Sequence, residues 1–534
     1  MVALRGYEGT MTGHREVERK FDAHEGDALP DLTDVEAVAA VGAATDIDLR
    51  ATYFDTADLR LARAGITLRR RTGGLDEGWH LKLPVGPEER TEMRLPLATS
   101  ESVVPDQLQH EVRALLRGRM LGPVASLHTL RTERPLLAAD GTVLATMADD
   151  TVRAQRFASG GGAATTWREL EVELVDGEPA LLGDATRVLA AAGISRSSSP
   201  SKLRRALGEA LDPPDADRRR PDRLGRDAPA GTVVVTYLRA QVEVLLAHDP
   251  GARHDAPDAV HQMRVASRRL RSALTTYRSL FDRTRTDPLR GELKWLGQTL
   301  GAARDAEVLW ARLDQLQAAL PPDLRFGPVA SRIRSEMATT HRVAHDLLID
   351  ALDHDRYHAL LDDLDALVDD PPFTERAGRR ADHVIPRLVG HAARRVDRAA
   401  AAVDRIAEAE PTGTATRARS GRDERSMALH EVRKAAKQAR YAAESAAASS
   451  GRPAERLGNR MEALQEVLGE HQDSVGAQQA LRAIALAAHL AGENAFSYGV
   501  LHGQEQARGE AAQEGYRTAL AAATKPKVRA WTEV

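Results

Sequence analysis

A change in the spacing of apolar residues divides this chain and strongly limits its fold. From residue 15 to about residue 208, apolar and charged residues alternate in short runs that Gly, Pro and Asp interrupt, as in β-strands. From about residue 232, apolar residues recur every three or four positions, as on one face of an α-helix. Residues 211–231 are rich in Pro, Asp and Arg and show neither period. We therefore predict an α+β protein with a β domain at residues 14–210, a linker at 211–231 and an all-helical domain at 232–515.

The composition limits the kind of site that the chain can build. The 534 residues include no Cys, so disulfides and thiolate metal ligands are excluded. Without Cys or a run of about 18 apolar residues, we expect a cytoplasmic protein with no membrane partner. A net charge of −4 and an aromatic content of 4% argue against a nucleic-acid partner, although 74 Lys and Arg residues allow local basic surfaces.

Charged residues gather on one face of several predicted strands. In EVERKF, strand geometry places Glu16, Glu18 and Lys20 on one face, with Val17 and Phe21 on the other. For a single strand, such a face is most simply a solvated surface. The pattern recurs, however, in other runs, where the residues on one face are Glu169, Glu171 and Glu173; Arg69 and Arg71; His80 and Lys82; and Arg90, Glu92 and Arg94. Because like charges two positions apart repel, this repetition indicates a bound counter-charge.

A metal ion bound together with phosphate would satisfy both sets of charges. Carboxylates from distant strands offer hard oxygen ligands to Mg²⁺ or Mn²⁺, and Arg and Lys bind phosphate oxygens. A closed antiparallel barrel of about eight strands can face polar side chains inward around one small ligand when helices cover its apolar outer face. We therefore predict a closed β tunnel with flanking helices in the first domain.

Short motifs follow one another along the first domain in an order known from one protein family. They are EVERK, YFDT, LRRR, HLKLP, RTE, LRTER, ELEVEL and SKLRRAL. EVERK fits the E-x-E-x-K signature of the CYTH superfamily of triphosphate tunnel metalloenzymes, which this domain resembles. The resemblance implies a divalent cation held by Glu16, Glu18, Glu171 and Glu173, which together with Lys20 would be catalytic, with Glu169 in support. It also implies a triphosphate bound by Lys20, Arg69, Arg71, Lys82, Arg90, Arg131, Arg134 and Lys202.

The resemblance leaves the roles of three acidic residues open. Asp55 in YFDT either orders the backbone of a turn or takes part in function. Asp149 is followed by Asp150, so the family landmark can fall on either residue. Glu92 shares a strand face with the basic residues, and the sequence assigns it no definite role.

The helical region contains an internal repeat. His261, Arg264, Arg268 and Arg271 recur as His430, Arg433, Lys437 and Arg440, each 169 positions later. LGAARD likewise recurs as LGEHQD, at an offset of 168. We therefore predict two related helical bundles. In the first copy the basic residues form a stripe without acidic residues at four-residue spacing, which favours anion binding over a solvated face.

With its two His-x-x-Arg signatures, this region resembles the CHAD domain, the conserved histidine α-helical domain. The resemblance implies that inorganic polyphosphate binds to His261, Arg264, Arg268, Arg271, His430, Arg433, Lys434, Lys437 and Arg440. We expect no metal at the two histidines, because no other ligands cluster near them in the sequence.

Two hypotheses of function follow for the whole chain. In the first, the tunnel is a metal-dependent hydrolase of inorganic triphosphate or a related triphosphate, and the helical domain binds polyphosphate. The alternative is a noncatalytic protein that binds polyphosphate or associates with polyphosphate granules, the tunnel only capturing a chain end. Related tunnel enzymes act on thiamine triphosphate, RNA triphosphates or ATP, and the tunnel motifs do not choose among these substrates. The polyphosphate-type helical domain favours inorganic triphosphate.

Overall fold

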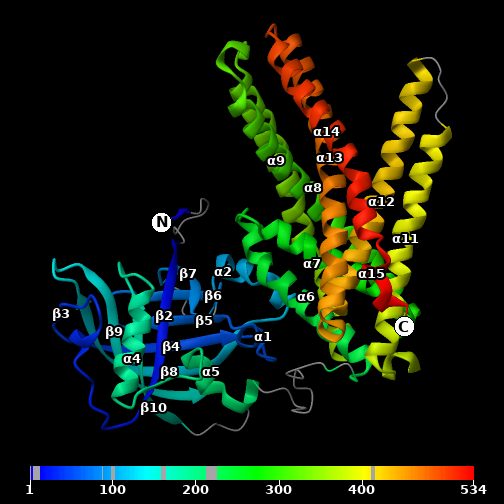
Figure 1. Ribbon diagram of the computed structural model, residues 1–534. Coiled ribbons are helices and arrows are strands. Elements are labelled where there is room, and N and C mark those ends of the chain that lie inside the picture. Colours follow the sequence, from blue (N-terminus) through cyan, green and yellow to red (C-terminus); the bar gives the residue numbers. More distant parts are fainter. Residues whose placement is uncertain are drawn as a thin grey trace. The chain divides into compact units, whose positions relative to one another are not determined.

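Antiparallel strands form one sheet in the first part of the computed structural model (Figure 1). The structure describes residues 2–3, 12–86, 88–97, 103–157, 164–211, 225, 227–409 and 415–533. The chain divides into two units, Met1–Arg219 and Arg220–Val534. Each unit has its own hydrophobic core, so each is described by itself below.

Eight of the described strands close the sheet into a barrel. Their order is β2, β10, β9, β8, β4, β5, β6 and β7, and β7 pairs again with β2. The bounds are β2 Thr12–Ala23, β4 Thr45–Asp55, β5 Thr67–Thr72, β6 Gly78–Pro84, β7 Glu89–Leu95, β8 Gly122–Leu137, β9 Val143–Arg156 and β10 Thr165–Leu174. The short strands β1 (Val2–Ala3) and β11 (Ser195–Arg196) pair with β2, and β3 (Ala40–Val41) pairs with β8. The predicted closed antiparallel barrel of about eight strands is confirmed.

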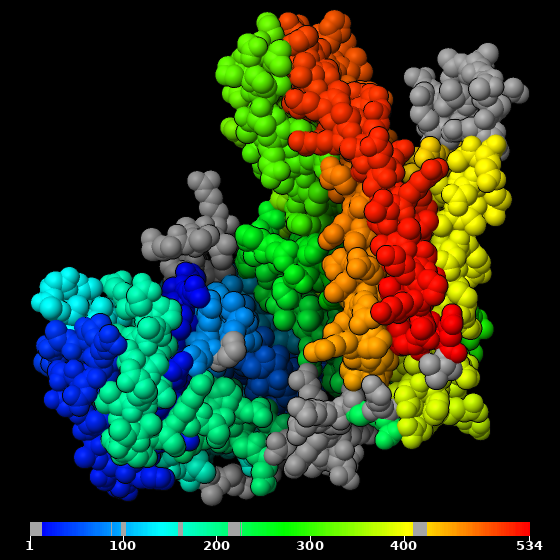
Figure 2. Space-filling view, viewed as in Figure 1, coloured from blue at the N-terminus to red at the C-terminus, as the bar shows by residue number. Residues whose placement is uncertain are grey.

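Alternation along the strands gives the barrel a polar interior and an apolar exterior. Phe21 and Val172 are fully buried in an outer core beneath α4, whereas Glu16, on the other face of β2, lines the interior. Trp79 lies in a second outer core, beside α2 and α3. Figures 1 and 2 show α4 lying over one face of the barrel. The helices of this unit are α1 Arg60–Arg63, α2 Asp106–Glu111, α3 Arg113–Leu116, α4 Ala180–Ala191 and α5 Lys202–Leu207, with 3-10 turns η1 Leu32–Asp34 and η2 Gly208–Leu211.

Helix α5 packs against inward-facing side chains at one end of the barrel. Its Leu203 and Leu207 share a core with Leu127 of β8 and Val152 of β9, which lie on the inner faces of those strands. Ser201 begins the helix, because its side chain accepts a hydrogen bond from the backbone N–H of Arg204. The helix therefore presents Lys202 to the barrel interior.

The second unit is built of long helices in two similar series. They are α6 Ala230–Arg253, α7 Ala259–Thr276, α8 Arg283–Ala319, α9 Val329–Asp353, α10 Asp355–Asp369, α11 Ala381–Ala409, α12 Ala415–Ser450, α13 Arg452–Leu490, α14 Phe496–Ala523 and α15 Pro526–Arg529. Each helix of the series α6, α7, α8 and α9 contacts the next, and the same holds for α11, α12, α13 and α14; α7 also contacts α12. The repeat of 169 residues thus relates α7 to α12, and the predicted pair of related helical bundles is confirmed.

The apolar stripe of the first His-x-x-Arg helix forms part of this core. Met263, Ala266, Leu270 and Leu274 of α7 are all buried. Their three- and four-residue spacing therefore turns the basic residues of the same helix toward another face.

One described helix, α6, is long and apolar enough to cross a membrane by length and composition alone. In the structure, 44% of its most apolar window is buried in the helical unit, and Val233, Val234 and Leu238 belong to the core. A core helix satisfies the same test.

Two predicted connecting segments have different outcomes. The predicted linker at 211–231 lies largely outside the described residues, with Leu211 ending η2 and Ala230 beginning α6. The sequence also predicts a loop at 411–426 that splits the helical region; residues 411–414 lie outside the described residues, and α12 already begins at Ala415. Ala and Arg favour helix without an apolar face, which explains the difference.

Candidate functional site

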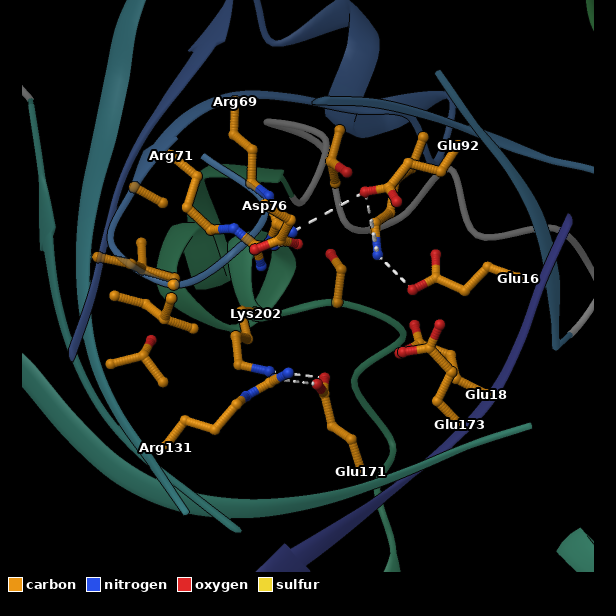
Figure 3. Close-up of a pocket in the computed structure, with 18 of the residues that line it drawn as sticks. Glu16, Glu18, Arg69, Arg71, Asp76, Glu92, Arg131, Glu171, Glu173 and Lys202 are labelled. Atoms are coloured by element: carbon orange, nitrogen blue, oxygen red, sulfur yellow. Dashed lines mark hydrogen bonds and ion pairs between the residues drawn. The ribbon is translucent and has the colours of Figure 1, made fainter. Parts of the chain in front are cut away.

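The interior of the barrel is a cavity of about 270 Å³ lined by acidic and basic side chains (Figure 3). It brings together residues that the sequence spreads over β2, β5, β6, β7, β8, β10 and α5. The predicted site residues that line it are Glu16, Glu18, Lys20, Arg69, Arg71, Lys82, Arg90, Arg131, Glu171, Glu173 and Lys202.

The structure does not bring Arg134 to this cavity. Leu127, Thr129 and Arg131 of β8 line it, and alternation places Arg134 on the opposite face of the strand. Arg134 pairs in register with Met147 of β9, which is buried in the outer core. The three-residue spacing from Arg131 thus puts Arg134 on the outside of the barrel.

Three carboxylates of β2 and β10 and two guanidinium groups of β5 occupy different sides of the cavity. In Figure 3, Glu16, Glu18 and Glu173 lie together on one side, and Arg69 and Arg71 lie on the other. This follows from the strand order, because β2 and β10 are neighbours, while β5 lies on the far side of the closed sheet. A ligand in the cavity meets carboxylates on one side and guanidinium groups on the other.

Lys20 and Lys82 are paired with the carboxylates of β2 and β10. Nζ of Lys20 donates to Glu18 at 3.0 Å and also contacts Glu171, while Nζ of Lys82 donates to Glu16 at 2.6 Å. Burial alone lowers the pKa of Lys20, but Glu171 and Glu18 outweigh burial and raise it above its ordinary value. Lys20 is therefore charged in the absence of ligand.

A second set of pairs surrounds Lys202. Its Nζ lies 2.6 Å from Glu171 and 2.9 Å from both Glu169 and Asp150. Arg131 binds Asp150 with two hydrogen bonds, of 2.8 and 2.7 Å, and donates to Glu171 at 2.6 Å. Oxygens of these three carboxylates lie within 4.8 Å of one another. Lys202 and Arg131 already supply the positive charge that such a group requires.

Glu16 and Glu173 have less counter-charge. Oε2 of Glu16 is buried and accepts no hydrogen bond from any described residue. Burial raises the pKa of Glu173 to about 7, with a further contribution from the negative charges of Glu16 and Glu18. Buried, under-compensated carboxylate oxygens are the ligands that Mg²⁺ and Mn²⁺ bind, so the residues present fit a divalent cation.

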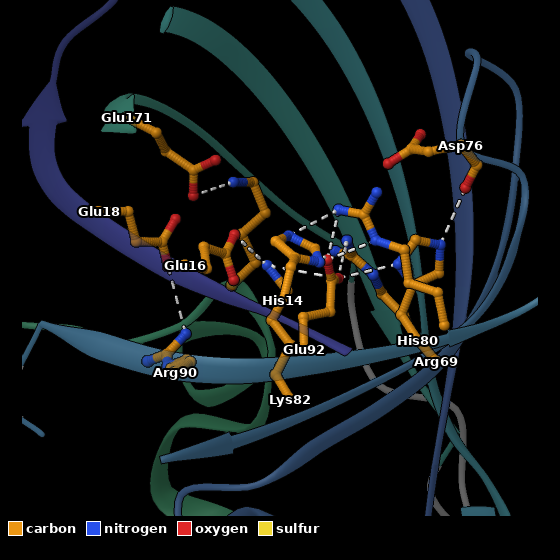
Figure 4. A network of polar contacts seen from close by, with 12 residues as sticks. His14, Glu16, Glu18, Arg69, Asp76, His80, Lys82, Arg90, Glu92 and Glu171 are labelled. Atoms are coloured by element: carbon orange, nitrogen blue, oxygen red, sulfur yellow. Dashed lines mark hydrogen bonds and ion pairs between the residues drawn. The ribbon is translucent and has the colours of Figure 1, made fainter. Parts of the chain in front are cut away.

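Glu92 is the centre of a polar network in the same cavity (Figure 4). It is fully buried, and its Oε1 lies 2.9 Å from Nδ1 of His80, 3.7 Å from Lys82 and 4.0 Å from Arg69. Burial alone raises the pKa of Glu92, but its hydrogen bond with His80 and the nearby cations outweigh it and hold that pKa well below its ordinary value. Glu92 thus remains ionised and holds Lys82 and Arg69 in place.

The structure separates two acidic residues that the sequence left ambiguous. Asp150 is fully buried on the inner face of β9, whereas Asp149 on the outer face pairs with Arg168 at 2.9 Å. The adjacent pair of aspartates was the only sequence signal for Asp150. Asp55 accepts hydrogen bonds from three backbone N–H groups, at residues 56, 61 and 62, and so orders the start of α1.

The helical unit contains a basic cleft of about 1040 Å³. Its lining comes from α7, α8, α11, α12 and α13. All the residues of the predicted polyphosphate set line it: His261, Arg264, Arg268, Arg271, His430, Arg433, Lys434, Lys437 and Arg440.

The two repeats place equivalent arginines against equivalent glycines. A Cβ atom at Gly301 would lie 3.7 Å from the guanidinium of Arg264, and one at Gly469 would lie 3.3 Å from that of Arg433. Each arginine thus packs against the glycine of the facing helix, and a Cβ would be tighter than an ordinary contact only at Gly469. Arg264 also pairs with Asp305 at 2.9 Å, which supports a bridging role for that aspartate.

Cations in the middle of the cleft lack sufficient counter-charge. Burial, together with Arg268 and Arg433, lowers the pKa of Lys437 to about 6. Burial and Arg264 lower the pKa of Arg268 to about 10. Because like charges accumulate around these buried groups, the cleft would gain stability from a bound polyanion.

The ends of the two basic stripes differ from each other. Burial and Arg290 lower the pKa of Arg271, whereas Arg440 pairs with Glu444 at 2.7 Å and with Glu462 at 2.8 Å. The second stripe is therefore partly neutralised where the first is not. A four-residue spacing between Arg440 and Glu444 is visible in the sequence and could have revealed this.

Family comparisons agree with both units. The CYTH domain matches residues 14–207, and the CHAD domain matches residues 236–482. The chain is 39% identical over 520 residues to the uncharacterized protein Rv2226 of Mycobacterium tuberculosis and to its counterpart in a second strain, with 95% of this chain and 96% of each relative covered. The chain therefore belongs to the family of proteins that join a CYTH domain to a CHAD domain.

Solved structures resemble parts of the chain. PptA from Streptomyces chartreusis matches 55% of this chain and 100% of its own, with 24% identity and a TM-score of 0.44. A proposed adenylyl cyclase from Hippeastrum, described as having a dominant triphosphatase activity, matches 35% of this chain and 93% of its own, with 17% identity and a TM-score of 0.20.

Proposed function

We propose that the barrel hydrolyses inorganic triphosphate, or a related triphosphate, with Mg²⁺ or Mn²⁺, and that the helical unit binds inorganic polyphosphate. One observation carries the first part: carboxylates and guanidinium groups face each other across one cavity of the barrel (Figure 3). Oε2 of Glu16 and Nε of Arg69 and Arg71 are buried without hydrogen-bond partners among the described residues. A phosphate chain together with a divalent cation would supply partners of both signs.

The residues of the cavity divide into two roles in this reaction. Glu16, Glu18, Glu171 and Glu173 would hold the divalent cation, which polarises a phosphoryl group and assists the attack of water. The phosphate chain would be bound by Lys20, Arg69, Arg71, Lys82, Arg90, Arg131 and Lys202. These cations neutralise charge as water attacks the terminal phosphorus in line, the P–O bond breaks, and phosphate and diphosphate leave.

The helical cleft supports the second part of the proposal. Lys437 and Arg268 sit among like charges, so they favour an anion that contacts many cations at once. A chain of phosphates offers such repeated charges. Because the contacts are ionic, we expect polyphosphate affinity to fall steeply with added salt.

Phosphate release is the experiment that tests the catalytic proposal. The full chain would be assayed with triphosphate, polyphosphate, ATP and thiamine triphosphate, each with Mg²⁺ and with Mn²⁺. Glu16→Gln should lower turnover at least about 100-fold, because it removes a charge from the proposed metal site without changing side-chain shape. Glu25→Gln, at an exposed residue outside the cavity, is the matched control. Full turnover in Glu16→Gln would refute the assignment.

The alternative function is a noncatalytic polyphosphate-binding or granule-associated protein. It shares the basic cleft, so binding alone does not distinguish the two, whereas turnover does. In either case we propose a cytoplasmic location, with polyphosphate granules as the site of association. Imaging a fluorescent fusion of the wild type beside an Arg264→Ala, Arg268→Ala, Arg433→Ala, Lys437→Ala variant would test the role of the cleft in that association.

A further inference from the structure

The turn between β5 and β6 places a carboxylate against a guanidinium group of the barrel cavity. Gly74, Leu75 and Asp76 of this turn line the cavity, and the Asp76 carboxylate forms an ion pair with Arg71 (Figure 3). Gly73 and Gly74 have φ angles of 85° and 82°, which glycine adopts without strain. None of the sequence motifs assigns a role to Asp76.

Arg71 differs from the other buried cations in the source of its counter-charge. Lys20 and Arg131 pair with carboxylates fixed on the barrel strands, whereas the partner of Arg71 lies on a turn. The side chain of Arg71 is 9% exposed and that of Asp76 is 33% exposed. The Nε of Arg71 has no hydrogen-bond partner among the described residues.

The backbone of the turn is held while the Asp76 side chain remains at the edge of the cavity. Nε2 of His80 lies 2.9 Å from the carbonyl oxygen of Asp76 (Figure 4). A Cβ at Gly73 would lie 2.0 Å from the carbonyl oxygen of Asp48, so this glycine lets the turn pack closely on β4. Rotation about the side-chain bonds of Asp76 can therefore move its carboxylate toward solvent without moving the strands.

We propose that Asp76 occupies the place of a phosphate on Arg71 in the ligand-free barrel and is displaced by anions long enough to reach Arg71. A single phosphate held near Lys20 and Lys202 leaves the Asp76–Arg71 pair intact. A triphosphate that extends to Arg71 must break the pair. Asp76 thus lowers the affinity for triphosphate and acts as a positioning residue for Arg71; this inference rests on the proposed triphosphate site.

Calorimetric titration of the full chain tests this inference. Triphosphate and orthophosphate would be titrated at fixed ionic strength into wild type and Asp76→Asn. We expect Asp76→Asn to bind triphosphate about tenfold more tightly, since a hydrogen-bonded charge pair no longer has to be broken, and to bind orthophosphate as the wild type does. Asp76→Glu should behave as the wild type, and Glu77→Gln, which neutralises the exposed neighbouring residue of the same turn, is the matched control.

Each outcome bears on either the inference or the proposed hydrolysis. Unchanged or weaker triphosphate binding by Asp76→Asn would overturn the inference, as would an equal gain with Glu77→Gln or with orthophosphate. If wild type and variant show the expected difference in binding but release no phosphate, the inference stands and the proposed hydrolysis fails. If the wild type hydrolyses triphosphate while Asp76→Asn binds it like the wild type, the hydrolysis stands and the inference fails. If neither binds triphosphate, both are wrong.

Discussion

Replacing Glu173 by Gln should stabilise the barrel at about pH 8 when no divalent cation is present. Burial and the carboxylates of Glu16 and Glu18 raise the pKa of Glu173 to about 7. The folded protein therefore retains this proton over a pH range in which the unfolded chain has lost it. A carboxyl group whose pKa is raised by folding contributes stability at pH values below its pKa in the unfolded chain. This stability is lost as the pH rises through its pKa in the folded protein, so the wild type should lose stability between about pH 4.5 and 7.

The size of this effect follows from the same shift. Moving the pKa from 4.5 to about 7 corresponds to a loss of about 3 kcal/mol once the carboxyl is ionised. This is an upper limit, because Gln must still bury an amide. Glu133→Gln is a suitable control: Glu133 also lines the cavity, but its negative charge acts favourably on Arg131. It should gain no stability at the higher pH.

Hydrogen exchange detected by mass spectrometry can measure the effect in the full chain, because peptides from β2 and β10 report on the barrel alone. With EDTA present, Glu173→Gln should protect these peptides more than wild type at about pH 8, and the two proteins should agree at about pH 5. Adding Mg²⁺ should protect the wild type and reduce the difference. Equal protection at both pH values, or the same gain in Glu133→Gln, would refute the account of Glu173.

Three other outcomes are expected from the charges of the two units. Arg268→Ala should weaken binding of long-chain polyphosphate more than Arg440→Ala in a titration, because Glu444 and Glu462 already neutralise Arg440. Polyphosphate affinity should fall as pH rises above 6, by at most about tenfold for each pH unit. The reason is that the pKa of Lys437 is lowered to about 6, so this lysine must take up a proton when polyphosphate binds. Because Arg is always charged, Lys437→Arg should remove most of this pH dependence in titrations over the same range. Triphosphate should bind the barrel more tightly with Mg²⁺ than with EDTA, and equal affinities in the two conditions would contradict the proposed metal site.

Much of the fold can be predicted from the sequence because the spacing of apolar and charged residues agrees with the packing of the strands and helices. The alternation in EVERKF places Glu16 inside and Phe21 in the outer core, as the barrel shows. The offset of 169 residues relates α7 to α12 because a repeated sequence gives repeated helix packing. Neither prediction required knowledge of contacts distant in the chain.

The sequence is ambiguous about the site where a motif crosses both faces of a strand. LRTER contains Arg131 and Arg134, but three positions along a strand reverse the face, so only Arg131 reaches the cavity. The same rule separates Asp149 from Asp150. Side chains alternate between the two faces of a strand, and this alternation would have resolved both cases. It required knowing first which residues of β8 and β9, such as Thr129, face the barrel interior. The pairing of Asp76 with Arg71 depends on the path of a turn, which no periodicity predicts.

The two anion sites differ in what must be broken before a ligand binds. In the barrel, Lys20, Lys82 and Lys202 are already paired with carboxylates, so a phosphate chain contacts these lysines only by replacing existing pairs. If phosphate alone bound the lysines, Glu16 and Glu171 would lose their counter-charge. A divalent cation bound to these carboxylates would replace that counter-charge and free the lysines to bind phosphate. Cation and phosphate should therefore each favour the binding of the other. In the middle of the helical cleft less exchange is required, because Arg268 and Lys437 lie among like charges there. If the proposed function holds, the barrel would select one small anion together with its metal, and the cleft would retain any sufficiently long chain of phosphates.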